Sequence, residues 1–191
     1  MGRFFARGMG HSKKQLKLVG ASGGCGAKGW WTAGSCTWRA GASRAKRPYL
    51  ERVRRAAEGL PVRIHTNAPG PLVEDLFASS SIFWVATGLG ESEERQPWVF
   101  EHFGITTAEA MAAGCVPVII DKAGQRETVR HGIDGYRLST MDELASYTQS
   151  LACDAPFRQH LTASAVERAK EFSEDAFTAR WAEIEASLGI A

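Results

Sequence analysis

Two carboxylates, Glu101 and Glu109, flank a short glycine-containing stretch, EHFGITTAE. Gly104 lets the backbone approach a ligand closely, and the residues from Ile105 onward have the pattern of a helix. The first turn of such a helix presents N–H groups and the positive end of its dipole, which favours a phosphate. Glu109, one turn into the helix, is placed to accept hydrogen bonds from vicinal hydroxyls such as those of a ribose. Glu101 could do the same for a sugar, or stabilise positive charge that develops beside it.

A simpler interpretation exists for each of these residues. Glu109 could sit on a solvated helix face and Glu101 in an ordinary loop, because short motifs often match by chance. His102 is interpreted as a loop side chain, since titration near neutral pH does not by itself make a proton-transfer group. Asn67 precedes Ala-Pro-Gly, where it could line a base pocket or serve only the chemistry of a turn.

The elements that would position these residues alternate between strand and helix patterns from residue 47 onward. Strands are predicted at 61–66, 81–87, 116–120 and 136–138, and helices at 47–60, 71–80, 105–113 and 125–132, with further helices from about 141 to 188. This alternation predicts an α/β domain, a Rossmann-like parallel sheet with helices on both faces. Ligands of such sheets bind at the carboxyl ends of the strands.

The first 45 residues differ from the rest. Residues 21–43 contain six Gly, five Ala and three Trp but no aliphatic residue larger than Ala. A segment that can bury so little is expected to be an irregular, poorly packed loop, and translation out of frame from GC-rich DNA would explain it. An uninterrupted frame through this segment in close relatives would contradict that origin. We therefore divide the chain into a truncated start (1–20), an irregular segment (21–45) and the main domain (46–191).

Charge is also distributed unevenly along the chain. The first 55 residues contain 13 Lys and Arg but only one acidic residue, Glu51, although the whole chain has a net charge of +2. Such asymmetry prompts a hypothesis of binding to nucleic acid or to an anionic membrane surface.

Composition narrows the classes of protein to which the chain could belong. No window has the roughly 18 consecutive apolar residues of a membrane span and no apolar signal core opens the chain, so we expect a cytoplasmic protein. The four cysteines form no C-x-x-C pair, which argues against a zinc site and a disulfide framework. Cys115 enters an apolar strand, where core packing is the expected role.

The stretch EHFGITTAEAMAAGCVPVIIDKAGQRETVRHGIDGYRL resembles the C-terminal domain signature of the retaining family-4 glycosyltransferases. It contains an E-x7-E motif, an EAMA-x-G-x-PV run and a G-x-x-E-x-V-x-x-G-x-x-G run. The first twenty residues resemble that domain's opening GRF-x(n)-GHSKKQ segment. The resemblance implies a nucleotide-binding domain, the second of two in a GT-B fold, which transfers a glycosyl group from a nucleotide sugar to an acceptor hydroxyl with retention.

The resemblance also implies roles for single residues. Glu101 would face the donor sugar and Glu109 would hold the ribose of the nucleotide. Backbone amides at Gly104, Ile105 and Thr106 would contact the sugar and the distal phosphate.

A basic pair, Arg3 and Lys13, would clamp the diphosphate, with Lys14 as the alternative to Lys13. Because cationic side chains can replace a metal ion there, no metal and no cofactor beyond the donor substrate is expected.

The chain departs from the family pattern in ways that bear on activity. No strand precedes Arg3, and residues 21–43 stand where the family has a second core strand, so the sheet is expected to lack its two N-terminal strands. A GT-B enzyme also places its acceptor site on an N-terminal domain that the chain does not contain. We therefore expect a truncated and inactive domain. Two alternatives stay open: a noncatalytic remnant that binds nucleotide sugars, and nucleic-acid or anionic-surface binding by the basic N-terminal segment.

Overall fold

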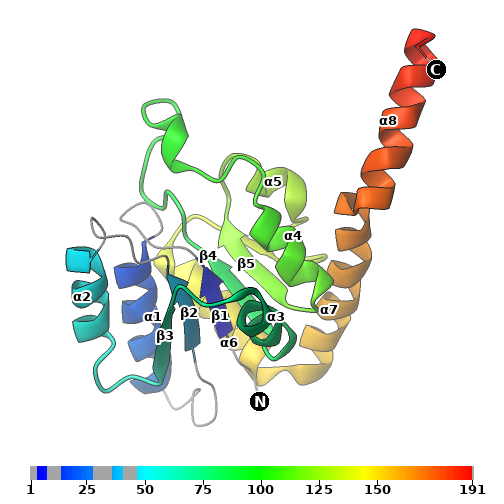
Figure 1. Cartoon of the computed structure of the whole chain (residues 1–191). Coiled ribbons are helices and arrows are strands. Elements are labelled where there is room, and N and C mark those ends of the chain that lie inside the picture. The colour runs from blue at the N-terminus through cyan, green and yellow to red at the C-terminus, as the bar shows by residue number, and fades with distance from the viewer. Residues whose placement is uncertain (1–3, 8–13, 28–35, 41–46, 191) are drawn as a thin grey trace.

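The computed structural model describes residues 4–7, 14–27, 36–40 and 47–190. They form three layers, with helices on both faces of one central sheet (Figure 1). The six strands are parallel in the order β3-β2-β1-β4-β5-β6. They are β1 (Phe4–Arg7), β2 (Cys36–Ala40), β3 (Val62–Thr66), β4 (Ile82–Val85), β5 (Val116–Ile120) and β6 (Tyr136–Leu138). The predicted α/β class with an open parallel sheet is confirmed.

The expectation that two N-terminal strands are missing is wrong. β1 begins directly after Arg3 and lies in the middle of the sheet, where it pairs with β2 on one side and β4 on the other. β2 lies inside the segment that was expected to be irregular, and it pairs with β1 and β3. Parallel pairing uses backbone N–H and C=O groups, so β2 needs no aliphatic side chains to form. Its central Thr37 and Trp38 are of types that favour strands.

Eight helices of the described residues surround the sheet. They are α1 (Gln15–Ala27), α2 (Arg47–Ala56), α3 (Gly70–Ala78), α4 (Ile105–Ala112), α5 (Gln125–Thr128), α6 (Met141–Cys153), α7 (Ala155–Ala169) and α8 (Glu174–Leu188), with short 3-10 helices η3 (Pro97–Val99) and η4 (Lys170–Phe172). The helix α1 extends seven residues into the segment from residue 21 that was expected to be irregular.

Alternate side chains of β4 point to opposite faces of the sheet, and different helices cover the two faces. Ile82 and Trp84 lie in a core with buried residues of α1, α2 and α6. Phe83 points to the opposite face and packs with Val73 and Phe77 of α3. The indole N–H of Trp84 donates a hydrogen bond of 3.1 Å to Thr148 of α6, so this buried polar group is satisfied.

The strand order reverses direction between β1 and β4. From β1 the chain proceeds to β2 and β3 on one side, and then returns to the other side with β4, β5 and β6. Loops at the carboxyl ends of the strands diverge at such a switch point and leave a crevice for ligands. The loop that follows β4 leads from this switch point to the EHFGITTAE stretch.

The last helix, α8, projects away from the body of the molecule (Figure 1). It buries none of its residues, and Phe177, Trp181, Ile184 and Leu188 are exposed. No helix within the described residues is both long and apolar enough to cross a membrane.

Candidate functional site

A hollow of about 540 Å³ lies where α4 begins. It is lined by the continuous stretch from Trp98 to Thr106 and by Glu109, and we call it the carboxyl-edge hollow. All the loop and helix residues assigned from the sequence lie on it. These are Glu101, Gly104, Ile105, Thr106 and Glu109.

Gly104 makes the transition from loop to helix. Its φ of 86° is in the left-handed region, which favours glycine, and it occupies the N-cap position of α4. Its carbonyl oxygen accepts hydrogen bonds from the N–H groups of Thr107 at 2.7 Å and Ala108 at 3.3 Å. In the described part of the chain no side chain caps this helix end, and the positive end of the α4 dipole lies at the hollow, which Ile105 and Thr106 line.

The back of the loop rests on α5 and the residues just before it. A Cβ on Gly104 would lie 2.3 Å from the Nε2 atom of Gln125, and a Cβ on Gly124 would lie 1.6 Å from the carbonyl oxygen of His102. The hydroxyl of Thr128 donates a hydrogen bond of 3.0 Å to the carbonyl oxygen of Phe103. The loop can pack this closely against residue 124 only because that residue is a glycine.

Two further hollows meet the first one at Glu109. One, of about 530 Å³, lies between α3 and α4 and includes Val73 and Phe77. The other, of about 490 Å³, lies between α4, α7 and η4 and includes Phe172. Glu109 therefore borders all three spaces, which makes it the most central side chain of the site.

A family model described as Glycosyl transferases group 1 matches residues 40–168 of the chain. The chain belongs to this family. It is 37% identical over 79 residues to a protein of Dictyostelium discoideum named GDP-Man:Man(3)GlcNAc(2)-PP-Dol alpha-1,2-mannosyltransferase. That match covers 41% of the chain but only 16% of the relative.

Solved structures of similar proteins show the same fold. The C-terminal domain of the group 1 protein LpcC from Francisella tularensis is 14% identical with a TM-score of 0.71, and the match covers 88% of this chain and 84% of that one. Anabaena HepE in complex with UDP-glucose is 18% identical with a TM-score of 0.76, and the match covers 97% of this chain and 49% of that one. The fold is that of the C-terminal domain of a GT-B glycosyltransferase.

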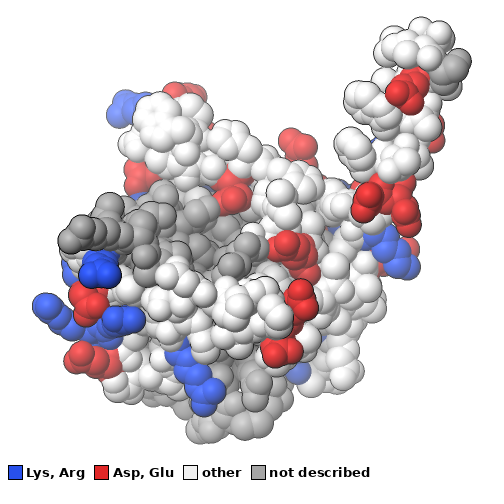
Figure 2. Space-filling model, in the orientation of Figure 1, with Lys and Arg blue, Asp and Glu red and all other residues white. Residues whose placement is uncertain are grey.

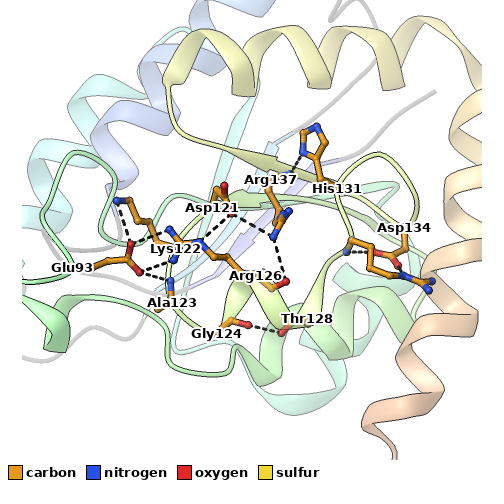
Figure 3. A network of polar contacts seen from close by, with 11 residues as sticks. Glu93, Asp121, Lys122, Ala123, Gly124, Arg126, Thr128, His131, Asp134 and Arg137 are labelled. Carbon is orange, nitrogen blue, oxygen red and sulfur yellow. Dashed lines mark hydrogen bonds and ion pairs between the residues drawn. The ribbon is translucent and has the colours of Figure 1, made fainter.

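In this group 1 domain, a cluster of charges fixes the segment that carries Gly124 (Figure 3). The carboxylate of Glu93 accepts a hydrogen bond of 2.7 Å from the N–H of Ala123 and forms ion pairs with Lys122 at 3.3 Å and Arg126 at 3.0 Å. Burial is the largest single influence on the pKa of Glu93 and raises it. The hydrogen bond from Ala123 and the two cations together outweigh burial and hold the pKa below its usual value.

The cations assigned to the diphosphate are the least defined part of the group 1 site. Arg3 and Lys13 lie outside the described residues. β1 begins at Phe4 and ends at Arg7, so Lys13 follows this strand in the chain whereas Arg3 precedes it. Lys14, the alternative, forms an ion pair with Glu91 and is not among the described residues that line the carboxyl-edge hollow.

Other sequence assignments in the group 1 domain have clear outcomes. Cys115 is fully buried and its thiol lies 3.4 Å from the carbonyl oxygen of Phe77, and burial raises its pKa to about 12, so the expected core role is confirmed. Asn67 has a φ of 52° after β3, a conformation typical of a turn. Within the described residues, no group of three or more His, Cys, Asp or Glu side chains could hold a metal ion.

Sequence reasoning missed the support behind the loop, which is formed by Gln125, Thr107 and Thr128. Gln125 is fully buried, and its carboxamide oxygen accepts a hydrogen bond of 3.0 Å from the Thr107 hydroxyl. The only sign of this support in the sequence was that Gln125 and Thr128 lie in the G-x-x-E-x-V-x-x-G-x-x-G motif that starts at Gly124. That motif does not reveal what the side chains contact.

Proposed function

We propose that this chain supplies the donor-nucleotide half of a retaining family-4 glycosyltransferase that uses a nucleotide sugar. The observation that carries the proposal is that Glu101 and Glu109 line one hollow at the N-terminal end of α4. The names of similar proteins support a nucleotide-sugar donor, since HepE was solved with UDP-glucose and the Dictyostelium relative is named for GDP-Man.

The geometry supports the binding of different parts of the nucleotide sugar at different residues of the hollow. The diphosphate would lie at the start of α4, where Gly104, Ile105 and Thr106 bring backbone amides and the helix dipole together. Glu109 would accept hydrogen bonds from the ribose hydroxyls, and the hollows that meet there leave space for the rest of the nucleoside. Glu101 would face the donor sugar.

In the reaction, the bond between the anomeric carbon and the diphosphate oxygen breaks. A bond from the acceptor oxygen to the same carbon forms on the same face, and the proton of the acceptor hydroxyl passes to an oxygen of the leaving diphosphate. The helix N-terminus, with Lys13 as the proposed cation, would stabilise the negative charge of the leaving diphosphate, whereas Arg3 comes before β1 in the chain and so before the strand end at which such ligands bind. Preorganised donors of this kind are each worth about 3 kcal/mol in other enzymes.

We further propose that the 191-residue chain binds the donor without turning it over. Among the described residues, those that line the carboxyl-edge hollow, 98–106 and Glu109, belong to a single stretch of chain. An acceptor would have to be held from the opposite side by another part of the enzyme. Turnover of a nucleotide sugar by this chain alone would contradict this part of the proposal.

The rival hypothesis of nucleic-acid binding rests on the basic N-terminal segment. Figure 2 shows Lys and Arg side chains on the side of the molecule where α2 lies, with Asp and Glu among them. Within α2, Arg54 pairs with Glu51 at 3.0 Å, so part of this positive charge is already neutralised. The nucleotide-sugar proposal is preferred because the residues of the family motif line one hollow.

Thermal unfolding with UDP, GDP and ADP, and with UDP-glucose and GDP-mannose, tests the proposal. One base should stabilise the protein, by about 2.7 kcal/mol when the ligand is at 100 times its Kd. Glu109→Ala should abolish that shift, whereas Glu183→Ala on the exposed face of α8 should preserve it. No stabilisation by any nucleotide, together with salt-sensitive binding of single-stranded DNA, would instead support the rival hypothesis.

A further inference from the structure

The side chain of Gln125 lies behind the loop that carries Glu101 and beneath the helix that carries Glu109. We infer that Gln125 is a positioning residue that holds these two carboxylates at a fixed separation, so that the nucleotide and its sugar are bound together. The inference deepens the proposed function and relies on it for the ligands of its binding experiment. Gln125 does not line the carboxyl-edge hollow, so it would act through the residues it contacts.

The two ends of the Gln125 carboxamide contact two different residues at the start of α4. The oxygen accepts the hydrogen bond from Thr107, which is two residues before Glu109 in α4. The nitrogen lies against the Cα of Gly104, so close that a Cβ there would be 2.3 Å away. The side chain is fully buried, and a buried amide has few alternative positions. The nitrogen has no hydrogen-bond partner among the described residues, so its contact with Gly104 is one of packing. Gln125 thus contacts both the N-cap residue, at which the loop ends, and the first turn of the helix.

Two neighbours of Gln125 hold the same loop. Gly124 lies against the carbonyl oxygen of His102, and Thr128 donates its hydroxyl hydrogen to the carbonyl oxygen of Phe103. Three consecutive loop residues, 102–104, are therefore each contacted by one residue of a single turn, 124–128. This match fixes the path of the chain just after Glu101.

The turn that makes these contacts is itself anchored. Ala123 has a φ of 47°, a left-handed conformation that is unfavourable for alanine, and its N–H is held by Glu93 (Figure 3). The Thr128 hydroxyl also lies 3.1 Å from the carbonyl oxygen of Gly124, which closes the turn on itself. A rigid base of this kind suits a positioning role, because a contact transmits a position only if it is itself fixed.

Loss of the Gln125 contacts should loosen the loop before Gly104 and its junction with the first turn of α4, while the rest of the helix and Glu109 stay in place. Affinity for a nucleoside diphosphate, which depends mainly on α4, should change little. The additional affinity conferred by the sugar depends on Glu101 and should fall. A purely structural role would instead reduce both affinities together.

The test compares Gln125→Ala and Thr107→Val with the wild type by calorimetric titration of UDP, UDP-glucose, GDP and GDP-mannose. For the base that the wild type binds, both variants should lose roughly tenfold in affinity for the nucleotide sugar and less than twofold for the diphosphate. Thr107→Ser keeps the hydroxyl and should restore the wild-type ratio. Thr148→Val removes a similarly buried hydroxyl from α6 and serves as the structural control.

Hydrogen exchange of the 102–108 amides supplies a readout that needs no ligand. Protection of these amides should fall in Gln125→Ala and Thr107→Val and remain unchanged in Thr148→Val. Unchanged exchange in the first two variants overturns the inference, whatever the ligand results. If the wild type binds no nucleotide but the exchange changes as expected, the proposed function fails while the positioning role stands. In Gln125→Ala and Thr107→Val, an equal loss of affinity for the diphosphate and for the nucleotide sugar also overturns the inference.

Discussion

The Cα of Gly124 faces the carbonyl oxygen of His102 so closely that a Cβ would lie 1.6 Å from that oxygen. Both partners are backbone, so neither can move aside as a flexible side chain would. We predict that Gly124→Ala lowers the free energy of unfolding by about 3 kcal/mol, measured by urea denaturation. It should also displace the loop and abolish nucleotide binding.

Gly20→Ala is the matched control. Gly20 lies inside α1 with no atom within 4 Å of the added methyl group, so this change should stabilise the protein by about 0.5–1 kcal/mol. If Gly124→Ala were as well tolerated as Gly20→Ala, the close contact between the two chain segments would not exist in solution.

Substitutions of the two carboxylates of the site should affect the binding of nucleotide and of nucleotide sugar differently. Glu109→Gln should lower the affinities for UDP and UDP-glucose, or for GDP and GDP-mannose, by the same factor of roughly ten. Both members of each pair contain the ribose that Glu109 is proposed to bind. Glu101→Gln should weaken only the nucleotide sugar. Isothermal titration of each variant with both ligands gives the two ratios. An equal loss of both affinities in Glu101→Gln would argue against its assignment to the sugar.

Glu93 should contribute to the pH dependence of stability. Its pKa in the folded protein lies below the usual value of about 4.3, so its ionised form stabilises the native state above that pH. That contribution is lost as the pH falls through the folded pKa. The loss of unfolding free energy between pH 7 and the acid range should therefore be smaller in Glu93→Gln than in the wild type. Glu94→Gln, at the exposed neighbour, should retain the wild-type slope.

Substitutions on the exposed face of α8 should leave the stability of the domain unchanged. Trp181 is about half exposed and α8 buries no residue, so Trp181→Gln should alter the unfolding free energy by less than about 0.5 kcal/mol. Leu161→Ala in α7 removes a fully buried side chain and should cost about 2–5 kcal/mol. A large loss in Trp181→Gln would mean that α8 packs against the domain in solution.

Periodicity predicted the elements from residue 47 onward closely, because their buried faces repeat along the sequence. The strand predicted at 116–120 is β5, and the helix predicted at 105–113 is α4. The helix predicted at 125–132 ends at Thr128 instead. Asp134 accepts a hydrogen bond of 2.7 Å from the N–H of Arg130, which holds the following residues in a turn.

The two N-terminal strands were missed because their stability does not depend on a local pattern. β1 and β2 are short, and each pairs with a neighbour on both sides. A central strand is stabilised by pairing and packing with strands and helices that are distant in the sequence, which no local pattern reveals. Composition alone therefore underestimated what residues 36–40 can form.

The sequence by itself provided the candidate residues of the site. Two carboxylates, a glycine and a predicted helix start stand along one continuous stretch, and the family resemblance of that stretch, rather than the spacing alone, singled them out. Only the tertiary structure decided what holds that stretch in place. The contacts of Gln125 with Thr107 and of Thr128 with Phe103 join residues 18 and 25 positions apart, and such packing arises from how the elements meet rather than from any pattern within them.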